Sequence, residues 1–189
     1  MELDKVIRKR KSVRNFSDKK PDWRDILECI DNARLVPLAG NNSILRYVVV
    51  NDKEKIQKLS ETAQQDFINQ SSYLVVVCSK PGRTKTGYKE RGEIYVRQQA
   101  GASIQNLLLS LENKGLASCW VGHFAEEQVK SILQIPEEIY VEAILPIGYE
   151  TSIKHKKSSS KNKAELDKIL YFNKWKEKRM KPLKGIKSA

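Results

Sequence analysis

The sequence predicts an α+β fold in which helices flank a central mixed β-sheet, and three observations lead to this prediction. The 189 residues are enough for one domain of ordinary size, with a core that needs neither disulfides nor metal. The composition, 40% hydrophobic and 31% charged, is typical of a soluble folded domain. Short β-branched runs alternate along the chain with longer stretches of helical periodicity, and no segment repeats.

Two helices are predicted before the first strand. A short apolar stripe around Val6 indicates a helix that ends in a basic turn. The stretch DWRDILECIDNARLVP then places apolar side chains at i, i+3 and i+4 spacing. Asp22 is suited to cap the start of this second helix, and Pro37 is suited to end it.

The middle of the chain predicts two buried strands and the longest helix. RYVVVN (46–51) and YLVVVC (73–78) are too short and too β-branched for helices, whereas the amphipathic stretch between them (52–67) predicts one. Residues 80–92 combine three glycines with a high density of cations, which predicts a loop that either attracts an anionic cosubstrate or serves only solubility. Residues 93–115 predict the longest helix, and its small residues place it at the centre of the fold or at a subunit interface.

The remaining pattern completes one domain over residues 1–175. Two further strands, LASCWVGHF (116–124) and YVEAILPIGY (140–149), flank a short helix. Residues 150–163 are polar, basic and of low complexity, which predicts a flexible linker inside this domain. The aromatic segment that follows needs an apolar surface to cover, which a neighbouring subunit could supply, and residues 176–189 form a basic tail.

The formal net charge of +12 is unevenly distributed along the chain. Residues 154–189 carry +10, whereas residues 1–153 carry only +2. A basic tail can bind nucleic acid or another anionic polymer, but no recognition motif accompanies these lysines. We therefore expect the tail to be a solvated segment, with polymer binding as the less favoured alternative.

The composition also argues against membrane, secreted and metal-dependent classes. No apolar run approaches the ~20 residues of a membrane helix, and the basic N-terminus lacks a signal-peptide core, so we expect a cytoplasmic protein. Cys29, Cys78 and Cys119 lie far apart in apolar segments and are expected to be buried thiols. With only His123 and His155 in the chain, we expect no metal site.

The first stretch with recognisable chemistry is the basic turn RKRKSVR (residues 8–14). Guanidinium and ammonium groups, a hydroxyl and free main-chain amides at a bend are the groups that hold a phosphate. Arg10, Lys11, Ser12 and Arg14 could supply them. Taken alone, such a run is also typical of a solvated surface.

Two more stretches carry weaker signals. LVPLAGNN follows the second predicted helix and precedes a buried strand. Its amides could contact a flat heterocycle there, although the same residues are also typical of an ordinary loop. In GLASCWVGH, Gly122 permits close main-chain approach at a strand end. Core packing for Trp120 and a surface position for His123 are the simpler interpretations of its side chains.

Together, these stretches resemble the FMN-dependent nitroreductase family from residue 7 to about 175. RKSVR (10–14) is similar to the family's Arg-Arg-Ser-x-Arg opening, and ARLVPLAGNNSILRY to its Ala-x-x-Ala-Pro-Ser-x-x-Asn-x-Gln-Pro-Trp segment. NLLLSLENKGLASCWVGHF and ILPIGYE resemble two later family stretches. The chain departs from the family at Leu38, where Ser is usual, at Ser43-Ile44-Leu45, and at Glu150, which replaces Pro.

The resemblance implies an entwined α+β homodimer that holds two FMN molecules in clefts between subunits. It implies that the basic turn binds the FMN phosphate and ribityl chain, helped by a lysine of the C-terminal linker. It further implies that one loop contacts the isoalloxazine and that main-chain atoms after Trp120 lie along the ring. The residues concerned are Arg10, Lys11, Ser12 and Arg14 with Lys161 or Lys163, then Asn41 with the backbone of Pro37 and Leu38, and finally Val121 and Gly122.

The activity implied is an oxidoreductase that passes electrons from NADH or NADPH through flavin N5 to an oxidised small molecule, such as a nitroaromatic or a quinone, in a ping-pong sequence. No catalytic side chain is assigned, because the flavin supplies the chemistry. The absence of a GxGxxG fingerprint is consistent with a nicotinamide that stacks transiently on the flavin. The departure at Ser43-Ile44-Leu45 leaves dehalogenation, flavin fragmentation or dehydrogenation open as alternatives.

Overall fold

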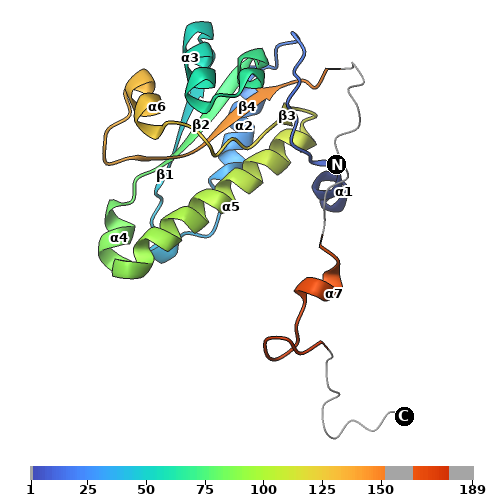
Figure 1. Ribbon diagram of the computed structural model, residues 1–189, viewed down its shortest axis with the longest axis vertical. Helices are drawn as coiled ribbons and strands as arrows, with labels where there is room; N and C mark the ends of the chain where they lie inside the picture. Colours follow the sequence, from blue (N-terminus) through green and yellow to red (C-terminus); the bar gives the residue numbers. More distant parts are fainter. Residues whose placement is uncertain (1, 152–163, 179–189) are drawn as a thin grey trace, which may run out of the picture. The chain divides into compact units, whose positions relative to one another are not determined.

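The computed structural model describes residues 2–151 and 164–178. The chain divides into two compact units, Met1–Ser152 and Ile153–Ala189. The first unit contains a sheet with helices packed on both of its faces (Figure 1). The α+β class with a central sheet and flanking helices is thereby confirmed.

The sheet has four strands in the order β1-β2-β4-β3. They are β1 (Leu45–Val50), β2 (Tyr73–Ser79), β3 (Ala117–Ser118) and β4 (Tyr140–Gly148). Among the described residues every strand pair is antiparallel, where the sequence led us to expect a mixed sheet. β3 is far shorter than the predicted strand over 116–124, because pairing stops after Ser118 and resumes only as a single bridge.

One face of the sheet packs against α2 (Trp23–Ala33) and α5 (Gly92–Asn113). Because successive strand side chains point to opposite faces, Tyr73, Val75 and Val77 of β2 contact these helices. All three side chains are at most 4% exposed, and the buried apolar positions of α5 pack on them. The predicted long central helix is therefore correct in extent and place.

The other face packs against α3 (Lys53–Ala63) and α6 (Glu126–Leu133). The alternate residues of β2, Leu74, Val76 and Cys78, point to this side. Since β2 is buried on both faces, its sequence reads as a continuous apolar run rather than an alternating one.

Helix starts follow from capping side chains. Asp22 accepts a hydrogen bond from the main-chain N–H of Arg24 at 2.9 Å, which confirms it as the N-cap of α2. Asp52 does the same for α3 by accepting from the N–H of Lys55 at 2.9 Å. Each carboxylate also interacts favourably with the positive end of its helix.

Residues 80–92 are not the loop that their glycines suggested. They form α4 (Gly82–Tyr88) and a 3₁₀ turn, η3 (Lys89–Arg91), which leads directly into α5. Thr84 is buried and Pro81 begins the segment, so tertiary packing outweighs the low helix propensity of the glycines. Short helical segments also occur as α1 (Leu3–Lys9), η1 (Ala39–Asn41) and η2 (Asp66–Gln70).

In the second unit the described residues contain one short helix, α7 (Leu166–Ile169). The helix ends before the aromatic residues of this segment, and Tyr171 and Trp175 pack against each other with ring centroids 4.6 Å apart. Lys161 and Lys163, two of the expected phosphate ligands, lie outside the described residues. Among the helices that the structure describes, none is long and apolar enough to cross a membrane.

The α4–α5 contact makes a sharp stability prediction at Gly92. A Cβ added there would lie 2.6 Å from Lys85 Cα and 2.8 Å from the Thr84 carbonyl oxygen, both main-chain atoms that cannot rotate away. We expect Gly92→Ala to lower the free energy of unfolding by about 1–3 kcal/mol, measured by urea denaturation. Gly87→Ala is the matched control, since a Cβ there meets nothing within 4 Å. Equal unfolding midpoints for the two variants would contradict this packing.

Candidate functional site

The residues predicted to bind FMN fall into two groups near different ends of α5. The basic turn (residues 8–14) lies at the C-terminal end, where Lys9 forms an ion pair with Glu112 at 3.0 Å. The N–H of Val13 donates to the carbonyl oxygen of Ser118 at 2.9 Å, which ties the turn to β3. Figure 1 shows α1 beside this end of α5 and α4 at the opposite end.

The structure brings the basic turn next to Ser118 and Cys119 of the GLASCW stretch. Arg10 ends α1 and is half-buried, while Lys11, Ser12 and Arg14 are exposed. The Arg14 guanidinium lies 5.8 Å from the centre of the Phe67 ring, within cation–π range. Three cations and a hydroxyl are thus presented on one exposed bend.

Among the three cysteines, Cys119 is the one whose thiol lies beside the cations and the hydroxyl of this bend. Burial raises the pKa of the Cys119 thiol, opposed by the charge of Arg14, by a hydrogen bond with Ser12 and by the charge of Arg10. Burial also raises the pKa of Cys29 to about 11 and that of Cys78 to about 12. All three are buried free thiols, as predicted, and burial favours the protonated form of each.

Glu150, the residue that departs from the family pattern, pairs with the basic turn. Its carboxylate lies 2.7 Å from Lys11 Nζ, and both side chains are about half exposed. A main-chain bridge between Phe16 and Glu150 holds the two segments together. One cation of the predicted phosphate site is therefore already engaged by an internal anion.

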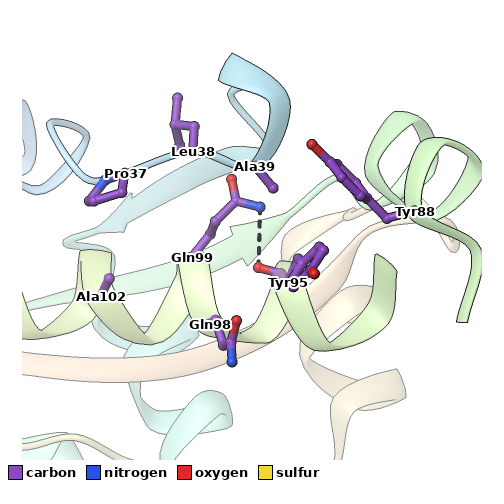
Figure 2. A pocket seen from close by; sticks show the side chains of 8 residues that line it. All are labelled: Pro37, Leu38, Ala39, Tyr88, Tyr95, Gln98, Gln99 and Ala102. Carbon is purple, nitrogen blue, oxygen red and sulfur yellow. Dashed lines mark hydrogen bonds between the residues drawn. The ribbon is translucent and has the colours of Figure 1, made fainter. Parts of the chain in front are cut away.

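In the second group, Pro37 and Leu38 line a cavity of about 480 Å³ between the loop after α2 and the N-terminal half of α5, whereas Asn41 lines a neighbouring cavity. We name the first cavity the ring pocket, and Figure 2 shows its side chains. Most of its wall is carbon from proline, leucine, alanine and two tyrosine rings. It is lined by Pro37, Leu38, Ala39, Tyr88, Tyr95, Gln98, Gln99 and Ala102.

Gln99 is the unusual side chain of this pocket. It is only 5% exposed, and its Nε2 donates to the carbonyl oxygen of Tyr95 at 3.2 Å. Its Oε1 is buried without a hydrogen-bond partner among the described residues. An unpaired buried amide oxygen costs roughly 1–3 kcal/mol, which a ligand donor in the pocket would recover.

Sequence reasoning missed Gln99, although a signal was present. It lies three residues after Val96 and four before Ser103, both buried, so it occupies the core-facing side of α5. A glutamine on the buried side of an apolar helix needs a polar partner, and this requirement indicates a candidate ligand-binding residue.

A left-handed loop at Gly40 and Asn41 follows the ring pocket's Ala39 and lines the cavity beside that pocket. Gly40 and Asn41 have φ of 60° and 53°, a conformation that glycine and asparagine tolerate best. A Cβ on Gly40 would lie 3.0 Å from the Tyr88 hydroxyl, so only glycine fits comfortably under this ring. Asn42 Nδ2 donates to Thr84 Oγ1 at 3.2 Å, which fastens the loop to α4.

Val121 and Gly122 lie after Trp120, near the middle of α5. A Cβ on Gly101 would lie 4.0 Å from the Trp120 ring. The N–H and carbonyl of Val121 both hydrogen-bond Ile144, at 3.1 and 3.0 Å. A main-chain hydrogen bond from this stretch to a ligand would therefore come from exposed Gly122 rather than from Val121.

The two groups of predicted FMN residues are well separated within one chain. The ring pocket reaches along α5 to Ala102, and the basic turn contacts Glu112. At 1.5 Å per residue these positions are about 15 Å apart along the helix axis, and Tyr95 is about 26 Å from Glu112. The structure brings Arg10–Arg14 together with Ser118 and Cys119, but it does not bring them to the loop at Pro37–Asn41.

Comparison with known proteins identifies the family. The model of the nitroreductase family matches residues 7–69 and 57–149, most of the first unit. A protein of Archaeoglobus fulgidus named NADH dehydrogenase/NAD(P)H nitroreductase is 32% identical over 150 residues, which are 77% of this chain and 83% of that protein. The chain therefore belongs to the nitroreductase family, and it is a nitroreductase-like oxidoreductase.

Other relatives and solved structures agree on the fold. Iodotyrosine deiodinase of Thermotoga neapolitana is 26% identical over 177 residues, covering 80% of this chain and 90% of the relative. The crystal structure of nitroreductase YdfN from Bacillus subtilis has a TM-score of 0.80 at 20% identity and covers 90% of this chain and 98% of that one. An FMN-dependent nitroreductase from Clostridium difficile R20291 has a TM-score of 0.75 at 21% identity, with coverage of 90% and 98%.

The Lys11–Glu150 pair predicts that one substitution strengthens binding at the basic turn. We expect Glu150→Gln to lower the dissociation constant of FMN by about two- to fivefold, because it frees Lys11 and removes an anion beside the phosphate. Quenching of FMN fluorescence on titration with apoprotein measures the constant. Glu138→Gln, which removes an exposed carboxylate that makes no ion pair among the described residues, is the control. Weaker FMN binding by Glu150→Gln would show that the carboxylate supports the site instead.

Proposed function

We propose that this chain is an FMN-dependent oxidoreductase that moves electrons from NADH or NADPH to a small oxidised acceptor, such as a nitroaromatic or a quinone. The flavin-binding domain extends over residues 1–175, and each flavin is shared between two chains of a homodimer. The observation that carries the proposal is the ring pocket, an apolar cavity with one buried, unpaired hydrogen-bond acceptor.

The pocket fits the ring of FMN. An isoalloxazine is flat and largely apolar, and its pyrimidine end carries a single N–H between two carbonyl groups. The apolar walls at Pro37, Leu38 and Ala102 suit such a ring, and Gln99 Oε1 is an acceptor in need of a donor. Burying the ring there satisfies the amide oxygen and removes apolar surface from water.

The basic turn fits the other end of FMN. Its phosphate calls for charge-assisted donors, which Arg10, Lys11 and Arg14 provide, and the Ser12 hydroxyl can bond the phosphate or the ribityl chain. Lys161 or Lys163 would add a further cation from the C-terminal linker. The exposed positions of Lys11, Ser12 and Arg14 leave them accessible to a ligand.

FMN, when bound, supplies the redox chemistry by accepting a hydride from a nicotinamide and delivering two electrons to the acceptor. The chain contributes binding, orientation and electrostatics. The apolar walls of the ring pocket exclude water from the reacting faces, and Gln99 fixes the orientation of the ring. The cations of the basic turn favour negative charge on the ligand.

The shared site follows from the separation along α5. When two chains pair with their α5 helices antiparallel, the basic turn of each lies beside the ring pocket of the other. Several large apolar side chains of α5, α2 and the segment after β3 are exposed, as expected for a surface that a second chain covers. Their exposed fractions are 45% for Ile94, 42% for Trp120, 50% for Trp23 and 44% for Leu27. These exposed side chains support the homodimer.

The comparisons support the redox assignment and also a second candidate. The names of the Archaeoglobus and Clostridium proteins refer to nitroreductase activity, and the latter name also refers to FMN. The Thermotoga relative, whose name refers to deiodination, is matched over 90% of its length. Reductive dehalogenation by the same flavin is therefore the alternative, and activity on iodotyrosine against activity on a nitroaromatic separates the two.

The first test is the visible absorbance of the purified protein, followed by anaerobic addition of NADH or NADPH. We expect the bands of bound oxidised flavin, because the ring pocket and the basic turn together retain FMN, and we expect these bands to bleach when the nucleotide is added. A colourless protein that also takes up no added FMN would overturn the proposed function.

The shared site can be tested by pairing two defective chains. Arg10→Ala with Arg14→Ala removes the phosphate cations, and Ala102→Trp fills the ring pocket. We expect neither homodimer to retain FMN, but the heterodimer, isolated through two different tags, should retain about one FMN per dimer, since one of its sites takes both intact parts.

The control for this experiment is the heterodimer of the wild-type chain with the Arg10→Ala, Arg14→Ala chain. It retains about one FMN whether each site is shared or lies within one chain. A heterodimer of the two defective chains that stays empty, while the control dimer is loaded, would place both parts of the site in the same chain.

A further inference from the structure

The ring pocket does not end at Tyr88 but continues between the left-handed loop and α4. Ala39 and Tyr88 line both the ring pocket and a second cavity of about 320 Å³. Asn42 and Arg83 line both this second cavity and a third, of about 350 Å³. The three cavities therefore adjoin in a row, and we refer to the row as the groove.

The far end of the groove differs in chemistry from the ring pocket. The third cavity is lined by three cations, Arg46, Lys80 and Arg83, together with polar groups and a glycine, Asn42, Ser43 and Gly82. We name this end the basic groove. Within residues 2–151 and 164–178, no carboxylate lies within ion-pair distance of any of the three cations.

Two cations on α4 and α5 do have acidic partners. Lys85 of α4 lies 3.3 Å from Glu93, and Arg97 of α5 lies 2.7 Å from the nearly buried carboxylate of Glu142. The three cations of the basic groove, by contrast, share one cavity without a carboxylate among the described residues that line it. A cluster of like charges on one cavity wall repels itself, and an anionic ligand relieves that repulsion.

The main-chain positions that carry the three cations are fixed by the scaffold. Arg46 lies on β1, which pairs with β2, and the N–H of Lys80 donates to the Ile44 carbonyl oxygen at 2.8 Å. Arg83 lies on α4, which the Asn42–Thr84 hydrogen bond fastens to the loop. The three side chains are exposed and accessible to a ligand from solvent.

We propose that the basic groove binds the anionic group of a reactant whose ring lies in the ring pocket against the flavin. This inference rests on the proposed function, and it deepens it by naming the substrate class: an aromatic molecule that carries a carboxylate or phosphate. Two reactants could bring that group, an anionic acceptor or the 2′-phosphate of NADPH, which NADH lacks. Either source uses the same charge-assisted bonds to Arg46, Lys80 and Arg83.

The test compares reactants that differ only in the anion. 4-Nitrobenzoate and 4-nitrobenzamide have nearly the same shape, and NADPH and NADH form the second matched pair. We measure kcat/KM for all four with the holoenzyme, and the dissociation constants of the two nitro compounds by calorimetry at constant ionic strength. The variants are Arg46→Gln, Lys80→Gln, Arg83→Gln and the triple variant.

We expect each single variant to lower the preference for the anionic member of a pair by about two- to fivefold, and the triple variant by about tenfold or more, with the neutral member unchanged. A falling nitrobenzoate preference identifies the acceptor as the source, and a falling NADPH preference identifies the nucleotide. Lys89→Gln is the matched control. It removes the same charge from the same segment, at a residue that lines none of the three cavities.

This design distinguishes failure of the inference from failure of the proposed function. If the protein retains FMN and reduces both nitro compounds, but neither preference changes in the triple variant, the inference is overturned and the proposed function stands. If the protein retains no FMN, the proposed function fails. Calorimetry then still decides the inference, because equal constants for 4-nitrobenzoate in the wild-type and triple-variant proteins overturn it.

Discussion

The packing of α5 on the central sheet is the constraint on which the rest of the structure depends. This 22-residue helix buries one side against β2 and β4 and carries the two groups of proposed flavin ligands near its two ends. Its N-terminal half forms the floor of the ring pocket, and its C-terminal end receives the basic turn. The helix therefore sets both the position of each group and the distance between them.

The second organising element is α4, whose residue Tyr88 forms one wall of the ring pocket. The main chain of α4 lies directly against Gly92, and Tyr88 lies over Gly40. Through these two close approaches, one short helix closes the ring pocket on one side and presents Arg83 to the groove on the other. Aromatic recognition and anion recognition are thereby built from the same few turns of chain.

Much of the fold could be predicted from local patterns, because those patterns report burial and capping directly. Asp22 caps α2 as predicted, and the apolar run of β2 is buried on both faces. The helix at residues 82–88 could not be predicted, since its stability comes from contacts with α5 rather than from its own glycine-containing sequence. For the site, motifs pointed to Arg10–Arg14 and Pro37–Asn41, and the helical pattern around Gln99 held a signal that sequence reasoning missed. Arg46, by contrast, acquires meaning only from the cavity that the fold builds around it.

The length of α5 between the basic turn and the ring pocket has a thermodynamic consequence. When a cofactor must contact two chains, cofactor binding and chain association become one linked equilibrium, in which each stabilises the other. For a flavin shared in this way, the occupancy of the site depends on the protein concentration as well as on the flavin concentration. Dilution alone would then release flavin, and saturating flavin would hold the two chains together at concentrations where the apoprotein dissociates.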